Sequence, residues 1–426
     1  MAKRRRPTKR ARHQQRSTVT RPRAYGAGRS GRRPPERPIA GPQAFTNLRD
    51  PAHVQSQAAT LLLIGSYLRG DPAATEARAR AAGTRAPSPA TPVGIVEAIP
   101  ADDLATLGFP QMTAGTARFA PGALERAAGV RFTARSTSAP AAGDVRAASR
   151  RLRGVAEVFY RDANPESAAA LLEVSLRHPH ELARVAAAVS YMEVTIAPTR
   201  AIRILERGVR SRDPLVRDVA AHALGRVDPR NARLAPLLVA KRRPSRRRPS
   251  RTSTIVHGTW ARTSAWWQPP TGDFWKYLHD NVDPDLYGAP DRFEWTGGYH
   301  DVARAEASED LHGWVQDPTH NLDGLDLFTH SHGGSVAMLA THAGTRVGRL
   351  VLLSCPVHWP KYTPEFSRVT KIVSIRVRLD LVILVDGGGQ RFSDPRINEH
   401  VLPIWFDHFT THDPETWEDH RIKDLL

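Results

Sequence analysis

The sequence predicts an α/β domain in its last two fifths, preceded by an α-helical region and a disordered basic arm. Two observations predict the α/β domain. The run GRLVLLSCPV, residues 348–357, is continuously apolar, as is typical of a parallel strand buried on both faces. In LFTHSHGGSVAML, residues 327–339, a hydrophobic strand passes directly into a serine and then a helix. A repeat of roughly 33 residues earlier in the chain predicts stacked helical hairpins.

Composition divides the chain into consecutive segments. They are a disordered basic arm (1–49), an Ala- and Pro-rich region with a helix expected at 52–69 (50–145), helical repeats (146–240), a basic linker (241–251) and the α/β domain (252–426). No pattern in residues 50–145 indicates what that region does.

The positive charge of the chain lies in two short tracts. Residues 1–38 hold 14 Lys and Arg against one acidic residue, and residues 241–251 hold seven more, so the rest of this +18 chain is nearly neutral. Tracts with so few apolar side chains cannot form a core and are expected to be disordered. Such tracts can contact an anionic membrane surface, a nucleic acid or no specific partner.

The helical repeats are visible by self-alignment. PESAAALLEVSLR, from Pro165, aligns without gaps with PTRAIRILERGVR, from Pro198. DPLVRDVAAHALGRV, residues 213–227, resembles the second helix of a HEAT-type repeat, which implies a recognition surface for a protein partner, with a structural spacer as the alternative. Because only two clear repeats are visible, the array is expected to pack against residues 50–145 or against the α/β domain.

Ser331 is the candidate nucleophile. Residues 329–333, Thr-His-Ser-His-Gly, have the spacing of a G-x-S-x-G elbow, in which a sharp strand-to-helix turn lifts the serine hydroxyl to the edge of a sheet. Thr329 stands where that motif has its first glycine. The elbow is therefore expected to accommodate a β-branched side chain at a crowded point.

A short β-branched strand in STIVHGTWA, residues 253–261, ends in His-Gly and predicts an oxyanion-binding loop. Backbone amides near Thr259 or Trp260 would supply one donor and the amide of His332, directly after the serine, the other. Trp260, Trp266 and Trp267 follow this strand. They are interpreted either as core packing or as an acyl-binding wall.

A serine triad in this chain order needs an acid and then a histidine. Asp380 follows a strongly β-branched run and is preferred to Asp386, which opens a glycine run and is typical of a turn. His408 is placed at the end of a last strand and is preferred to His412, which precedes a helix start at Asp413-Pro414. Asp386 and His412 stay open as alternatives.

On these residues, the segment 252–426 resembles a lipase- or esterase-type α/β-hydrolase domain. Residues 293–315 resemble the strand and helix that lie between the oxyanion strand and the elbow in that family. The resemblance implies a serine hydrolase acting on an ester or related acyl bond without a cofactor, in which Ser331 attacks, His408 transfers the proton and Asp380 orients it. A non-catalytic scaffold and a nucleic-acid-binding solenoid are the competing hypotheses.

The single cysteine, Cys355, lies in an apolar strand and is interpreted as a core thiol, so no disulfide within the chain is expected. No HExxH or paired CxxC spacing occurs, and no metal site is predicted. The basic start lacks the apolar stretch of a signal peptide, and residues 58–68 are too short an apolar run to span a bilayer. These features favour a cytoplasmic protein.

Overall fold

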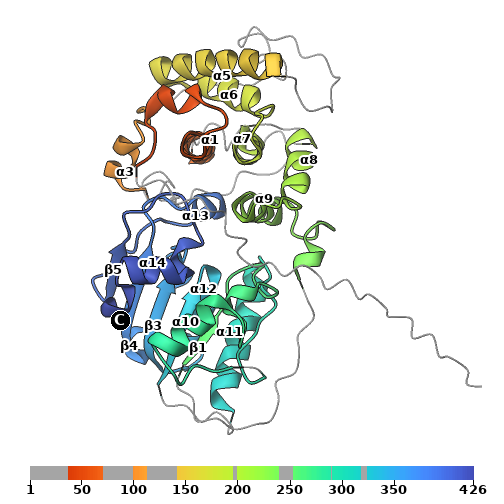
Figure 1. The fold of residues 1–426 in the computed structure, drawn as a ribbon. Helices are drawn as coiled ribbons and strands as arrows, with labels where there is room; N and C mark the ends of the chain where they lie inside the picture. Colours follow the sequence, from red (N-terminus) through yellow and green to blue (C-terminus); the bar gives the residue numbers. More distant parts are fainter. Residues whose placement is uncertain are drawn as a thin grey trace, which may run out of the picture.

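The structure is a computed structural model that places an α-helical part above an α/β part (Figure 1). It describes residues 37–70, 99–112, 142–194, 199–238, 253–288, 290–317 and 324–426. The basic tract up to residue 36 and the linker 241–251 lie outside these ranges. Among the described residues, no helix combines the length and apolar character needed to cross a membrane.

The α/β part is built on one parallel sheet, which confirms the predicted α/β class. Its strands follow one another in chain order across the sheet: β1 (Ser253–Val256), β2 (Leu325–His330), β3 (Val347–Leu353), β4 (Val369–Arg376) and β5 (Ile397–Val401). Since every strand runs the same way, their carboxyl ends all lie at one edge of the sheet.

Alternating side chains of the strands build two apolar layers, one on each face. Leu327 and Leu350 pack on one face with residues of α11 (Asp301–Gln316) and α12 (His332–His342). Phe328 and Val351 pack on the other face with residues of α10 (Asp273–Asn281) and α14 (Pro414–Asp419). Helices on both faces explain why these strands are continuously apolar.

One predicted strand does not form. Residues 293–296, in the segment expected to be a strand followed by a helix, have no strand structure, whereas the helix is present as α11. The loop is fixed by side chains instead: Trp295 is fully buried and its indole Nε1 donates to the carbonyl of His257 at 2.7 Å.

The helical part consists of helices of 6 to 21 residues that pack on one another. They are α1 (Pro51–Gly70), α3 (Ala101–Thr106), α5 (Ala142–Asp162), α6 (Pro165–Ser175), α7 (Glu181–Val194), α8 (Thr199–Gly208) and α9 (Pro214–Val227). The helix starts are specified locally: Asn164 caps α6 and Asp213 caps α9, each followed by a proline at the first helical position. The pairs α6–α7 and α8–α9 correspond to the two aligned repeats.

The predicted extent of the disordered arm, 1–49, is wrong at its end. Residues Gly41–Thr46 form a 3₁₀ helix, and Ala44 and Phe45 are fully buried in the helical core. The side-chain amide of Gln57, on α1, donates to the carbonyl of Ala44 at 2.6 Å. Charge dominates the composition of the arm as a whole, so the apolar residues at its end were not separated from it.

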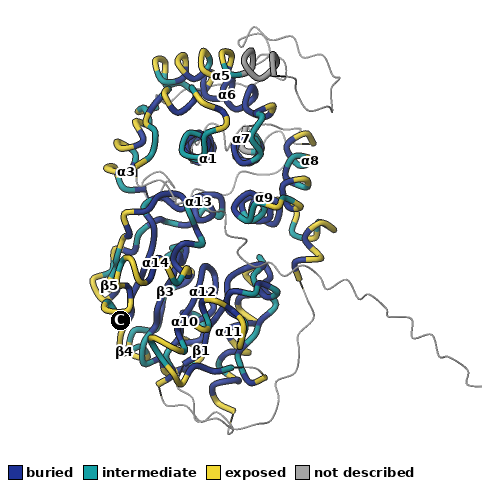
Figure 2. Tube along the Cα trace, viewed as in Figure 1, coloured by how far each residue is buried: buried dark blue, intermediate teal, exposed yellow. Residues whose placement is uncertain are grey.

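One apolar cluster spans the two parts. Helix α13 (Leu381–Asp386) contacts α1 and α9, and its Leu381 and Val385 are buried together with helical-part residues (Figures 1 and 2). Arg226 of α9 donates to the carbonyl of Val385 at 2.8 Å, and the buried Asp103 pairs with Arg391 at 3.0 Å. The repeats therefore pack against both candidates expected from the sequence, residues 50–145 and the α/β part.

Because α1 and α7 approach closely at Gly65, a side chain at this position is expected to destabilise the protein. A Cβ on Gly65 would lie 2.5 Å from Ser190 Cβ and 2.7 Å from Ser190 Cα, too close unless the helices separate. We expect Gly65→Ala to lower the free energy of unfolding by about 1–3 kcal/mol, as overpacking does. Gly154→Ala, on an open face of α5, is the control and should be neutral or stabilising by up to about 1 kcal/mol. Equal denaturant midpoints for the two variants would contradict the packing argument.

Candidate active site

The candidate residues gather at the carboxyl edge of the sheet. Thr259 follows β1, Ser331 follows β2, Asp380 follows β4, and His408 lies in the loop after β5. Loops at the carboxyl ends of parallel strands meet in space, and ligands of such sheets bind there. His408 is seven residues beyond the end of β5, so the prediction that it lies at the end of a strand is wrong, although the loop returns it to the same edge.

Ser331 occupies a strained turn between β2 and α12. Its backbone has φ 53° and ψ −133°, a conformation that L-residues rarely adopt and that costs roughly 1–3 kcal/mol. The turn is held by a hydrogen bond from the Ser331 amide to the carbonyl of Leu353 at 2.8 Å. A sharp strand-to-helix turn was expected at this serine, and the structure has one.

Two glycines allow the turn to pack. A Cβ on Gly333 would lie 2.1 Å from the carbonyl oxygen of Val256, and one on Gly258 would lie 2.8 Å from Ser331 Cβ. Both positions must therefore lack a side chain. Thr329, in place of the motif's first glycine, is accommodated because its hydroxyl points back into the sheet and donates to the carbonyl of Val351 at 2.8 Å.

Asp380 and His408 form a buried pair, with 2.7 Å between Asp380 Oδ2 and His408 Nδ1. The other carboxylate oxygen of Asp380 caps α13 by accepting from the amides of Val382 and Ile383. The side-chain amide of Gln390 forms two hydrogen bonds with the backbone of Asp380: it accepts from the N–H and donates to the carbonyl. The carboxylate is thus fixed on one oxygen and directed at the imidazole by the other.

The alternative acid and histidine lie elsewhere. Asp386 is the last residue of α13 and bonds His332 Nε2 at 3.0 Å and His358 Nε2 at 2.6 Å, a set of side chains that could also hold a metal ion. His412 is buried and stacks on Trp266, with ring centroids 4.0 Å apart. Burial lowers the pKa of His412 to about 3. Of the two acids and two histidines considered from the sequence, the structure pairs Asp380 with His408.

Of the three candidate oxyanion donors, the amides of Thr259 and His332 remain and the amide of Trp260 does not. The amide of Trp260 donates to the carbonyl of Gly297 at 3.0 Å, so the expectation that it serves an oxyanion is not supported. Thr259 precedes it in the same loop. His332 is the first residue of α12, where helix amides have no partner within the helix and the helix dipole is positive.

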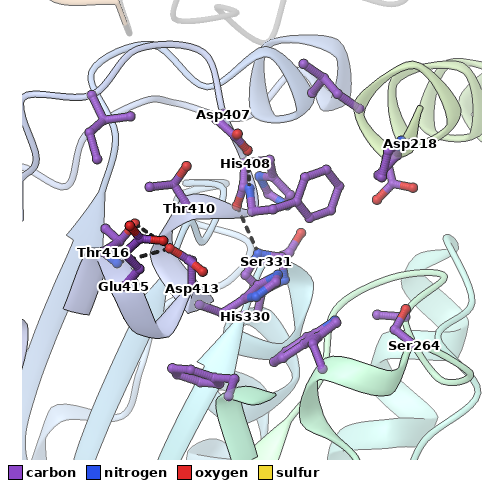
Figure 3. A pocket seen from close by; sticks show the side chains of 18 of the residues that line it. Asp218, Ser264, His330, Ser331, Asp407, His408, Thr410, Asp413, Glu415 and Thr416 are labelled. Atoms are coloured by element: carbon purple, nitrogen blue, oxygen red, sulfur yellow. Dashed lines mark hydrogen bonds between the residues drawn. The ribbon is translucent and has the colours of Figure 1, made fainter. Parts of the chain in front are cut away.

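A pocket of about 1740 Å³ opens over these residues, and both parts of the protein line it. Ser331, His408 and Thr259 lie on its wall from the α/β part, and Asp218 and His222 of α9 from the helical part. Figure 3 shows Asp218 on α9 facing this pocket from the side opposite Thr410 and Asp413. The helical part is therefore a roof of the pocket. The volume of the pocket exceeds the roughly 300–1,000 Å³ of ordinary small-molecule pockets.

Acidic groups around His408 set its charge. Burial disfavours the imidazolium, but Asp380, Asp218 and Asp407 together raise the pKa of His408 above its ordinary value. Burial also raises the pKa of Asp218 and of Asp407. A histidine with a buried carboxylate on one ring nitrogen can accept a proton on the other and hold it as a stabilised cation.

The tryptophans predicted near the site divide between the two interpretations. Trp260 and Trp266 line the pocket, whereas Trp267 is fully buried and packs beside His257, with ring centroids 4.6 Å apart. Cys355 is a buried free thiol whose pKa is raised by burial to about 12, as expected for a core residue.

Sequence reasoning missed three residues that shape this site. His330 lies between His408 and His412, and its Nε2 bonds the carbonyl of His408 at 3.1 Å. The signal for His330 was its place beside the serine. Gln390 and Asp218 had no signal, because one depends on a loop returning to Asp380 and the other on how α9 docks.

No protein-family model, curated protein or solved structure matches this chain.

Proposed function

We propose that residues 252–426 are an α/β-hydrolase domain and that the protein is a serine hydrolase of esters or related acyl compounds. The observation that carries the proposal is Ser331 in a strained strand-to-helix turn, on the wall of the same pocket as a histidine bonded to a buried carboxylate. Strain of this kind persists where the surrounding structure enforces it, and it is concentrated at functional sites.

Each group then has a chemical role. His408 uses Nδ1 for Asp380, which leaves Nε2 to take the proton of Ser331 as the hydroxyl attacks an acyl carbon. The bond to the leaving group breaks as Nε2–H protonates it, and water repeats the sequence on the acyl-enzyme. Amides of Thr259 and His332 would hold the negative oxygen of each tetrahedral intermediate.

We assign the helical repeats a second role, as the roof of the substrate pocket. The support is that Asp218, His222 and Leu182 line it together with Ser331. A roof built from a separate repeat unit gives room for a large or extended acyl substrate. The earlier interpretation of the repeats as a docking surface for a protein partner applies to their remaining faces, and it stays a proposal.

The experiment that tests the proposed function is turnover of p-nitrophenyl esters of graded acyl length by the full-length protein. We expect the protein to hydrolyse these esters. Hydrolysis should stop after pretreatment with a fluorophosphonate, because the reagent reacts with an activated serine and blocks its acylation. A protein that turns over none of these esters and does not react with the fluorophosphonate would contradict the proposal and favour the competing hypotheses, a non-catalytic scaffold or a nucleic-acid-binding solenoid.

The proposal also predicts a pH dependence. His408 must be neutral to act as the base, so kcat/KM should fall as the pH drops through its raised pKa. Asp218→Asn removes a negative charge that raises this pKa, so the acidic limb should move to lower pH. Glu309→Gln, an exposed carboxylate on α11, is the control and should leave the profile unchanged. A limb that moves to higher pH in Asp218→Asn, or does not move, would contradict the assignment of His408.

A further inference from the structure

A cluster whose side chains the proposed reaction does not use lies beside the elbow. His332, the first residue of α12, His358, in the loop after β3, and Asp386, at the end of α13, come from three separate elements. Their ligand atoms, two imidazole nitrogens and a carboxylate oxygen, all lie within 4.8 Å of one another. We propose that His332, His358 and Asp386 bind a divalent transition-metal ion, with zinc as the best-fitting ion.

The donor set fits zinc. Imidazole nitrogen and carboxylate oxygen are ordinary zinc ligands, and three protein ligands with one open position form a recurrent arrangement. Both histidines offer Nε2, at 3.0 Å and 2.6 Å from the two oxygens of Asp386. A tetrahedral ion needs each nitrogen slightly farther from the carboxylate oxygen. The two histidine nitrogens lie within 4.8 Å of each other.

The outer contacts are those of a metal ligand. His332 Nδ1 lies 3.1 Å from Ser335 Oγ, so the ring can donate there when Nε2 binds the ion. Such a bond on the second nitrogen fixes the tautomer and orientation of metal-binding histidines. The two rings lie nearly parallel, with an interplanar angle of 12°.

Charge and access also favour a cation. The cluster holds a carboxylate whose side chain is only 4% exposed, between two imidazoles. The nearby cation Arg304 is paired at 2.8 Å with Asp301, a carboxylate that Lys361 also contacts. His358 is 24% exposed, which gives an ion and a water ligand a path to the site. Gly388 keeps that side clear, since a Cβ there would lie 3.1 Å from His358 Nε2.

The competing explanation is a metal-free cluster in which both imidazoles donate to Asp386. Binding zinc replaces these two hydrogen bonds with metal bonds, and in each imidazole the proton of Nε2 moves to Nδ1 through exchange with water. The two explanations differ in whether the protein takes up an ion. Sequence spacing could not reveal such a site because the three residues are far apart in the chain.

The test is zinc binding by the full-length, untagged protein after treatment with a chelator, measured by calorimetry and by the visible absorption of bound Co²⁺. We expect one tight equivalent in the wild type. His358→Ala should weaken it by more than about 100-fold, beyond what loss of an outer contact costs. His279→Ala is the matched control, because His279 is bonded to Asp280 at 2.8 Å on the surface and should leave the tight equivalent intact.

Asp386→Asn gives a second, milder test that keeps the side-chain shape, and thermal melting shows whether each variant is folded. The proposal is overturned if the wild type binds no tight equivalent, or if folded His358→Ala binds zinc as tightly as His279→Ala does. None of these readouts uses catalytic activity, so the outcome is independent of the proposed hydrolase function.

Discussion

Ser331→Ala should lose ester hydrolysis almost completely while the protein stays folded. The serine hydroxyl forms the covalent bond in the proposed reaction, and neither Asp380 nor His408 can replace it. Loss of a triad nucleophile lowers kcat by roughly 10⁶-fold. The measurement is the initial rate of p-nitrophenyl ester hydrolysis, with the melting temperature recorded in parallel.

The matched control for this variant is Ser264→Ala. Ser264 lines the same pocket and is also buried, but it lies outside the elbow (Figure 3). Its hydroxyl has no role in the proposed chemistry, so kcat should change little. Ser331→Ala removes only the hydroxyl and keeps the Cβ and the same backbone turn, so it should not destabilise the fold. Ser331→Ala with more than a few per cent of wild-type activity would remove Ser331 from the mechanism.

The second large effect is expected at the buried pair. His408→Ala should lower kcat about as much as loss of the serine, because the base and the acid of the reaction are the same ring. Asp380→Asn should lower it by on the order of 10⁴-fold, because an amide no longer stabilises the imidazolium or fixes its tautomer. Both are measured as initial rates with the same ester.

The controls for this pair are the alternative residues. His412→Gln and Asp386→Asn should retain most of the activity, since His412 stacks on Trp266 and Asp386 bonds His332 and His358 rather than His408. Melting curves are needed here because both residues are buried. Loss of activity in a folded His412→Gln variant, with normal rates in His408→Ala, would reverse the assignment.

The sheet and most of its helices could be predicted because their sequence signals are local. Apolar runs marked β2 and β3, and the proline that follows Asp413 marked the start of α14. Residues 293–296 could not be assigned correctly, because their conformation is fixed by Trp295 packing and bonding to His257. The limit of the basic arm was missed because Phe45 is buried against helices distant in sequence.

The candidate site residues that follow strands could be predicted from the sequence, whereas those that depend on helix docking could not. Ser331 and Asp380 each stand where an apolar run ends, so their positions at one sheet edge followed from strand direction. The choice of Asp380 over Asp386 also depended on that placement. Asp218 reaches the pocket only because α9 docks on α13, a contact between segments about which the local sequence carries no information.

The most direct test of the central claim is to map the fluorophosphonate adduct on the full-length protein by mass spectrometry of its peptides. We expect one adduct, on Ser331, formed at a rate that falls sharply in His408→Ala. An adduct on another residue, or a folded protein that forms none, would contradict it.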